Sequence, residues 1–186
     1  MDINDVEEAQ RAIGSFVVFD RKESFPLLQP GHFVAAASRA GNVFSDEFLD
    51  FLDCAAPEDT LTLLVLDPSP SDYFGKHFAL YPLIRLSSRK AHEFFRDVHW
   101  APESSADSIA SRAERLAIVH PGGDWVMLSD RDTDLLLIYV ASQRTCEAIS
   151  RCLPEELKVP LQDVRNELDA AGVENADLVL GLRTSE

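Results

Sequence analysis

Lysine and arginine are scarce in this 186-residue chain: 17 of them stand against 32 aspartates and glutamates, giving a net charge of −15. Such a charge repels nucleic-acid phosphates and the anionic surface of a membrane, so direct binding to nucleic acid or lipid is disfavoured. A basic protein is an easier partner to accommodate, although an excess of acid also keeps many proteins soluble.

Long apolar runs are missing too, since no stretch approaches the eighteen residues that a membrane-spanning helix needs. The N-terminus, Met1 to Glu8, carries acids where a secretory signal has a basic region followed by an apolar run. We therefore expect a cytoplasmic protein without a membrane anchor.

Cysteine is rare, and the odd count of three, at Cys54, Cys146 and Cys152, is typical of a reducing compartment. Cys54 lies near Phe51 on a predicted helix, and we expect it to be a small buried apolar side chain. Cys146 and Cys152 are six residues apart, about 120° from each other around a helix, so they should not bridge each other.

The common catalytic and cofactor motifs are absent. The sequence contains no G-x-S-x-G elbow, no phosphate-binding G-x-x-x-x-G-K-[ST] or G-x-G-x-x-G loop and no H-E-x-x-H metal motif. We expect no cofactor and no bound metal, and the chain is more readily interpreted as non-catalytic than as an enzyme.

Alternating aspartates at Asp130, Asp132 and Asp134 are the nearest approach to a cation site. An EF-hand loop beginning at Asp130 would need Gly at its sixth position and Glu at its twelfth, where this sequence has Leu135 and Ala141. The segment is better interpreted as a polar hairpin tip in which Arg131 partly neutralises its acidic neighbours.

The five histidines offer the other possible chemistry. His92 and His99 share one face of a predicted helix, but seven residues place them about 10.5 Å apart, too far to bind one zinc ion. Together with His120 and the Asp130 to Asp134 loop, they are the candidates for an enzyme whose site is assembled from distant residues.

Apolar residues make up 46% of the chain, and their periodicity predicts alternating helices and strands. The predicted helices span residues 2–13, 45–55, 88–100, 107–119, 145–153 and 160–171. The predicted strands span residues 15–20, 33–37, 61–66, 78–86, 125–128 and 135–141. We infer one α+β domain over residues 1–186, with a mixed or antiparallel sheet packed against several helices.

The clearest unit is a β-hairpin in the C-terminal half, formed by residues 125–141 after the turn at Gly122 and Gly123. Its second strand is apolar on both faces, which predicts a place inside the sheet. Trp125 opens this hairpin and Trp100 ends a helix; core packing is the expected role of both indoles.

The helix from Asp46 to Ala55 has the most suggestive pattern. Phe48, Phe51, Leu52 and Ala55 form its apolar stripe, and it contains no basic residue. Its opposite side collects the four carboxylates of Asp46, Glu47, Asp50 and Asp53. A solvated helix face explains this arrangement, and a docking surface for lysine and arginine is the functional interpretation.

Three functions remain open at this point. The first is a non-catalytic, acidic, cytoplasmic protein-interaction domain of immunity or antitoxin type, which would bind a basic protein through Asp46, Glu47, Asp50 and Asp53. The alternatives are a structural or regulatory subunit and the enzyme assembled from distant histidines and aspartates. The distinction rests on size, charge and missing signatures, because no motif demands one of the three.

Overall fold

The computed structural model describes residues 3–18, 26–57, 60–79, 83–87, 91–101, 103–173 and 175–181. The helices are α1 (Ile3–Phe16), α2 (Asp46–Ala55), α3 (Lys76–Phe78), α4 (Ala91–His99), α5 (Ile109–Arg112), α6 (Gln143–Cys152), α7 (Leu161–Ala170) and α8 (Ala176–Val179). The strands are β1 (Val17–Val18), β2 (Leu27–Leu28), β3 (Phe33–Ser38), β4 (Thr60–Asp67), β5 (Leu83–Ser87), β6 (Arg115–Val119), β7 (Trp125–Asp130) and β8 (Leu135–Val140). Short helical turns cover Ala40–Phe44, Pro70–Gly75, Ser105–Asp107 and Glu155–Leu157.

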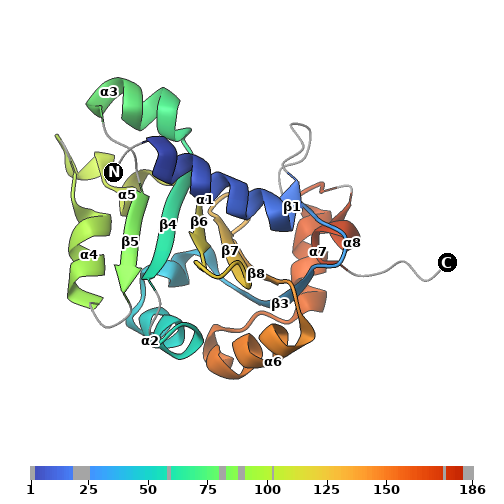
Figure 1. Cartoon of the computed structure of the whole chain (residues 1–186). Helices are drawn as coiled ribbons and strands as arrows, with labels where there is room; N and C mark the ends of the chain where they lie inside the picture. The colour runs from blue at the N-terminus through green and yellow to red at the C-terminus, as the bar shows by residue number, and fades with distance from the viewer. Residues whose placement is uncertain are drawn as a thin grey trace.

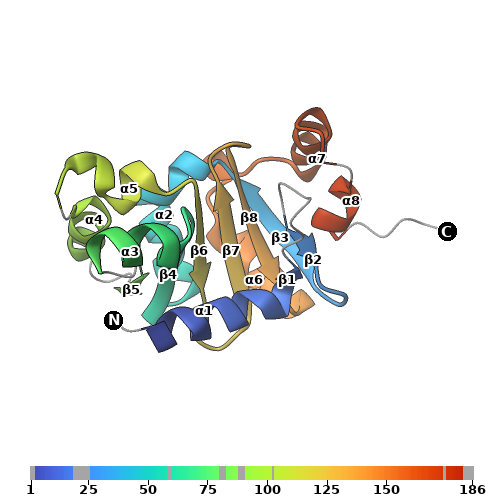
Figure 2. The same cartoon turned by 90° about the horizontal axis from the view of Figure 1, so that it is seen from above.

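Six strands form one sheet in the order β3-β8-β7-β6-β4-β5, and every neighbouring pair is antiparallel. A separate antiparallel pair, β1 and β2, lies beside it. Helices cover both faces of the six-stranded sheet: α1 runs across the strands on one face, and α2 and α6 pack on the other (Figures 1 and 2). The expected α+β fold, with an antiparallel sheet packed against helices, is confirmed.

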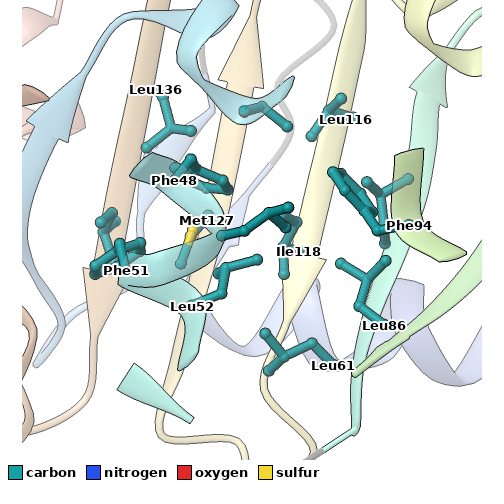
Figure 3. Packing of buried hydrophobic residues seen from close by; sticks show 14 of the residues in the cluster. Phe48, Phe51, Leu52, Leu61, Leu86, Phe94, Leu116, Ile118, Met127 and Leu136 are labelled. Carbon is teal, nitrogen blue, oxygen red and sulfur yellow. The ribbon is translucent and has the colours of Figure 1, made fainter. Parts of the chain in front are cut away.

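Side-chain alternation along the strands divides the core into two clusters. In β7, Trp125 and Met127 face the cluster under α2, α4 and α6, while Val126 and Leu128 face the cluster under α1, α7 and α8. Figure 3 shows the first cluster, where Phe48 and Phe51 of α2 lie over the sheet near Met127. Because the central strands are buried on both faces, their sequences are continuously apolar rather than alternating.

The predicted hairpin is confirmed. β7 and β8 pair from Trp125↔Val140 to Asp130↔Leu135, and they lie inside the sheet between β6 and β3. Every residue of β8 is fully buried. The strand predicted at 61–66 is likewise present within β4 and buried from both sides.

The helix predicted over 107–119 is wrong. Helix α5 is a single turn from Ile109 to Arg112, and residues 115–119 form β6, which joins β7 to β4. Leu116 and Ile118 belong to one core cluster, and Ala117 and Val119 to the other. A strand that is buried on both faces requires such a run, and burial at the sheet centre outweighs the weak helical pattern.

The N-terminal boundaries also differ from the prediction. Helix α1 continues through Gly14 to Phe16, because Val6, Ala9, Ile13 and Phe16 form one buried stripe. The strand expected over 15–20 therefore shrinks to β1, and its last two residues lie outside the described part of the chain.

One predicted strand and one predicted helix near the middle differ from the structure at their described ends. Phe78 ends α3, and the strand expected over 78–86 corresponds to β5, which lies at an edge of the sheet. Residues 80–82 of the expected strand lie outside the described residues. Helix α4 spans Ala91–His99, and residues 88–90 of the expected helix lie outside the described residues.

Helices α6 and α7 begin and end close to their predicted bounds. Ser142 caps α6, which begins two residues before the predicted start at 145: the Ser142 hydroxyl accepts a hydrogen bond from the Thr145 backbone N–H at 3.1 Å. Pro160 precedes α7, which ends at Ala170 just before Gly172, a residue with φ of +78°. The helix predicted over 160–171 is confirmed to within a residue.

A disulfide joins the C-terminal ends of α2 and α6, between Cys54 and Cys152, with 5.5 Å between their Cα atoms. Cys54 is exposed rather than buried, so the expected buried thiol is wrong, and Cys146 is the free cysteine. The two bonded cysteines are 98 residues apart and meet only because α2 and α6 pack side by side on the same sheet face.

Two further expectations concern surface and membrane. Trp125 is 2% exposed, as predicted, but Trp100 is 57% exposed at the end of α4, so its predicted core role is wrong. Among the described residues, no helix combines the length and apolar character needed to cross a bilayer.

Candidate functional site

Helix α2 carries the four predicted site residues on its outer side. Ser45 begins the helix, since its hydroxyl accepts a hydrogen bond from the Phe48 backbone N–H at 3.2 Å. Asp46 and Glu47 occupy the first turn, where the helix dipole favours negative charge. Asp50 and Asp53 follow one and two turns later, away from this favourable end.

The other side of α2 is anchored deeply in the core. Phe48, Leu49, Phe51 and Leu52 are each at most 5% exposed, and the Phe48 and Phe51 rings lie 5.5 Å apart. In Figure 3 these rings point from α2 toward the sheet. A helix held by four buried side chains presents its opposite face in a fixed orientation.

Asp46, Glu47, Asp50 and Asp53 are all exposed, and we call this set the acidic face of α2. The ten residues of the helix include no lysine, arginine or histidine. Like-charged neighbours at i, i+3 and i+4 cost roughly 0.2 to 0.5 kcal/mol per pair, a small penalty for the helix. The structure thus brings these four residues to one surface, which the 3.6-residue period had predicted.

The candidates for a catalytic site are not brought together. Asp130 pairs with Arg115 at one end of β6, whereas His120 follows the other end. Five strand residues separate the two ends by about 16 Å. His99 ends α4, and His92 lies in its first turn.

Asp130 has a structural role. It is 3% exposed; its Oδ2 accepts a 2.6 Å hydrogen bond from Arg115 Nε, and its Oδ1 accepts one from the Thr133 backbone N–H. Arg131 does not neutralise neighbouring carboxylates as expected: its Nη1 donates to backbone carbonyls around the end of α5, including that of Ser111 at 3.1 Å. These hydrogen bonds hold the tip of the hairpin in place, and they occupy the Asp130 oxygens that a cation would need.

His120 lies in a hollow between α1 and the sheet, which Asp5, Glu8, Thr60, Thr62 and Arg85 also line. Its Nδ1 accepts a hydrogen bond from the Gly122 backbone N–H at 3.2 Å, and its ring lies 5.2 Å from Trp125. Since Nδ1 is an acceptor there, the imidazole supports the turn at Gly122.

Metal coordination receives no support within the described ranges, where no group of three or more histidine, cysteine, aspartate or glutamate side chains converges on one point. One ion pair is bidentate: Arg39 donates to both Glu167 oxygens, at 2.7 and 2.8 Å. This hydrogen-bonded pairing lowers the pKa of Glu167 and raises that of Arg39. The pair links Arg39, which directly follows β3, to Glu167 of α7. Because the two residues are 128 apart in the sequence, no local pattern predicted their contact.

Comparisons with known proteins give no relative from which a role could be inferred. No family model matches the chain, and neither the curated proteins nor the solved structures that were searched contain a match.

Proposed function

We propose that this chain is a non-catalytic protein-interaction domain that binds a basic protein through the acidic face of α2. One observation carries the proposal: four exposed carboxylates on a helix without a base, held rigidly by four buried side chains. A fixed array of one sign of charge accelerates and orients association with a surface of the opposite sign.

The whole-chain charge supports the same partner chemistry. A net charge of −15 attracts a basic protein over distances of about a Debye length and repels polyanions such as nucleic acids. The proposal therefore excludes direct nucleic-acid binding and requires neither cofactor nor metal.

Immunity proteins and antitoxins provide the class analogy, since small acidic proteins of this kind bind and occlude basic toxins. A cytoplasmic location is part of the proposal and rests on the rarity of cysteine. In that reducing setting, Cys54 and Cys152 would be present largely as adjacent thiols rather than as a disulfide.

A pull-down with the tagged chain, from the cell that makes it, tests the proposal. At low salt we expect capture of a basic protein, with elution as the salt is raised, because screening weakens exposed ionic contacts. The Asp50→Asn and Asp53→Asn double variant should capture less of this protein at low salt.

A matched control separates the site from total charge. Asp163→Asn with Asp169→Asn removes two exposed carboxylates from α7, on the opposite face of the sheet, and should retain the partner. Capture that is insensitive to salt and to both double variants would contradict the proposal and favour a structural or regulatory subunit.

A further inference from the structure

We propose that the outer edge of β5 is a second docking surface, which takes an extended basic segment of a protein partner as an added antiparallel or parallel strand. The proposal goes beyond the acidic face of α2, because it concerns the edge of the sheet rather than a helix surface. It rests on the hydrogen bonds that the chain makes to one edge of the sheet, β3, and on the hollows beside the other edge, β5.

The opposite edge, β3, is covered by its own chain. The Val159 backbone N–H donates to the Ala37 carbonyl at 2.9 Å, and the Ser150 hydroxyl donates to the Ala35 carbonyl at 3.2 Å. Such cover prevents an edge strand from pairing with another protein.

No comparable backbone bond reaches the outer side of β5 from the described residues. Figure 1 shows β5 at the end of the sheet with α4 beside it. A hollow separates the two, and its lining includes Ile84, Arg85 and Leu86. Consecutive strand residues point to opposite faces, so a hollow that touches all three lies along the backbone edge of the strand.

This hollow has an apolar floor and an acidic rim. Ile84, Leu86 and Phe94 are each at most 8% exposed, and half-buried Glu93 and Asp97 of α4 line the same space. An added strand would place alternate side chains over this floor, within reach of the two carboxylates.

The remaining side chains of an added strand would point to the other face of the sheet. There the hollow beside α1 begins, and Arg85 and Thr60 line both hollows. Asp5 and Glu8 of α1 line this second space. A strand at β5 therefore meets carboxylates on both of its faces, which favours lysine and arginine in the incoming segment.

Asp5, Glu93 and Asp97 all have partners within the molecule. Asp5 accepts from Arg85 at 3.0 Å, and Asp97 accepts from Arg96 at 2.8 Å. Because the arginines in both pairs are largely exposed, water screens these contacts and they can exchange for others. Main-chain pairing should therefore provide most of the affinity, and charge the selectivity.

The test uses the full chain and two seven-residue peptides with blocked ends, one alternating lysine with valine and one alternating glutamate with valine. The length matches the five residues of β5 with one residue to spare at each end. Backbone amide NMR shifts during titration report where each peptide binds. The lysine peptide should shift the amides of β5 and α4, and the glutamate peptide should not.

Two controls separate strand pairing from charge attraction. Methylation of alternate amide nitrogens in the lysine peptide keeps its charge, and only the set that faces β5 should abolish binding. Glu93→Gln with Asp97→Asn should weaken binding about threefold to tenfold, whereas Asp163→Asn with Asp169→Asn on α7 should leave it unchanged.

Binding unaffected by either methylation pattern, shifts confined to the acidic face of α2, or equal binding of the two peptides would each overturn the proposal. The proposed function is tested separately from this proposal, because Asp50→Asn with Asp53→Asn should weaken partner capture without altering lysine-peptide binding at β5.

Discussion

At the scale of single residues, the structure assigns stabilising roles to several groups that the sequence marked as candidates for function. Asp130 was a possible cation ligand, yet both of its oxygens are occupied by Arg115 and the Thr133 N–H. The aspartate spacing was visible in the sequence. The partner was not, because Arg115 reaches Asp130 only through the pairing of β6 with β7.

The Arg39–Glu167 pair predicts a pH dependence of stability. Because the folded-state pKa of Glu167 lies below its unfolded value of about 4.3, the pair stabilises the fold above that pH and loses this contribution as the pH falls further. Both side chains are more than a third exposed, so water screens the pair. We therefore expect it to contribute at most about 1 kcal/mol to the free energy of unfolding.

Urea unfolding of the wild type and of Glu167→Gln, measured between pH 7 and pH 3, checks this expectation. The variant should be less stable at pH 7, and the difference should vanish toward pH 3. A difference that is constant across the range would contradict the assigned role.

Tyr139 supports a second residue-scale prediction. Its hydroxyl is fully buried, none of the described residues offers it a hydrogen-bond partner, and burial raises its pKa far above the usual value. An unpaired buried hydroxyl costs roughly 1 to 3 kcal/mol, so Tyr139→Phe should leave the free energy of unfolding unchanged or raise it. A loss of more than about 1 kcal/mol in urea unfolding would mean that the hydroxyl is satisfied.

At the scale of elements, helices and strands were predictable wherever one periodic pattern dominated. The stripe of α2 and its Ser45 cap needed no tertiary information, and the hairpin of β7 and β8 followed from its turn and its apolar strands. The prediction for β6 was wrong because a short apolar run fits a buried helix and a buried strand equally well. Only its position between β7 and β4 decides the outcome.

The disulfide predicts that α6 depends on its covalent link. Ile149 is the one fully buried residue of this helix, whereas α2 buries four. Closing a loop of 98 residues restricts the unfolded chain, for which about 4 to 5 kcal/mol of stabilisation is expected. Reduction should therefore lower the urea midpoint strongly and increase amide hydrogen exchange in α6 more than in α2.

Thiol titration of the purified, oxidised chain in denaturant provides the direct check. One thiol should react before reduction and three afterwards, since Cys146 is free. Cys146→Ala should retain the sensitivity to reductant, and Cys54→Ala with Cys152→Ala should lose it. Three reactive thiols before reduction would contradict the disulfide.

At the scale of the whole molecule, charge and fold together define the proposed function. Composition predicted an acidic surface, and helix periodicity predicted which four acids share a face. The difference between the two sheet edges could not be derived from the sequence, because the contacts that cover β3 come from residues 150 and 159. Such long-range contacts are fixed only by the complete topology.

The association rate of the captured basic partner with the wild type and with Asp50→Asn, Asp53→Asn tests the central claim most directly. Removing two repelling charges should leave stability unchanged or raise it by a few tenths of a kcal/mol. At low salt the double variant should associate several-fold more slowly than both the wild type and the Asp163→Asn, Asp169→Asn control, and the difference should shrink at high salt. Equal rates for all three folded proteins at low salt would show that the acidic face of α2 is only a solvated surface.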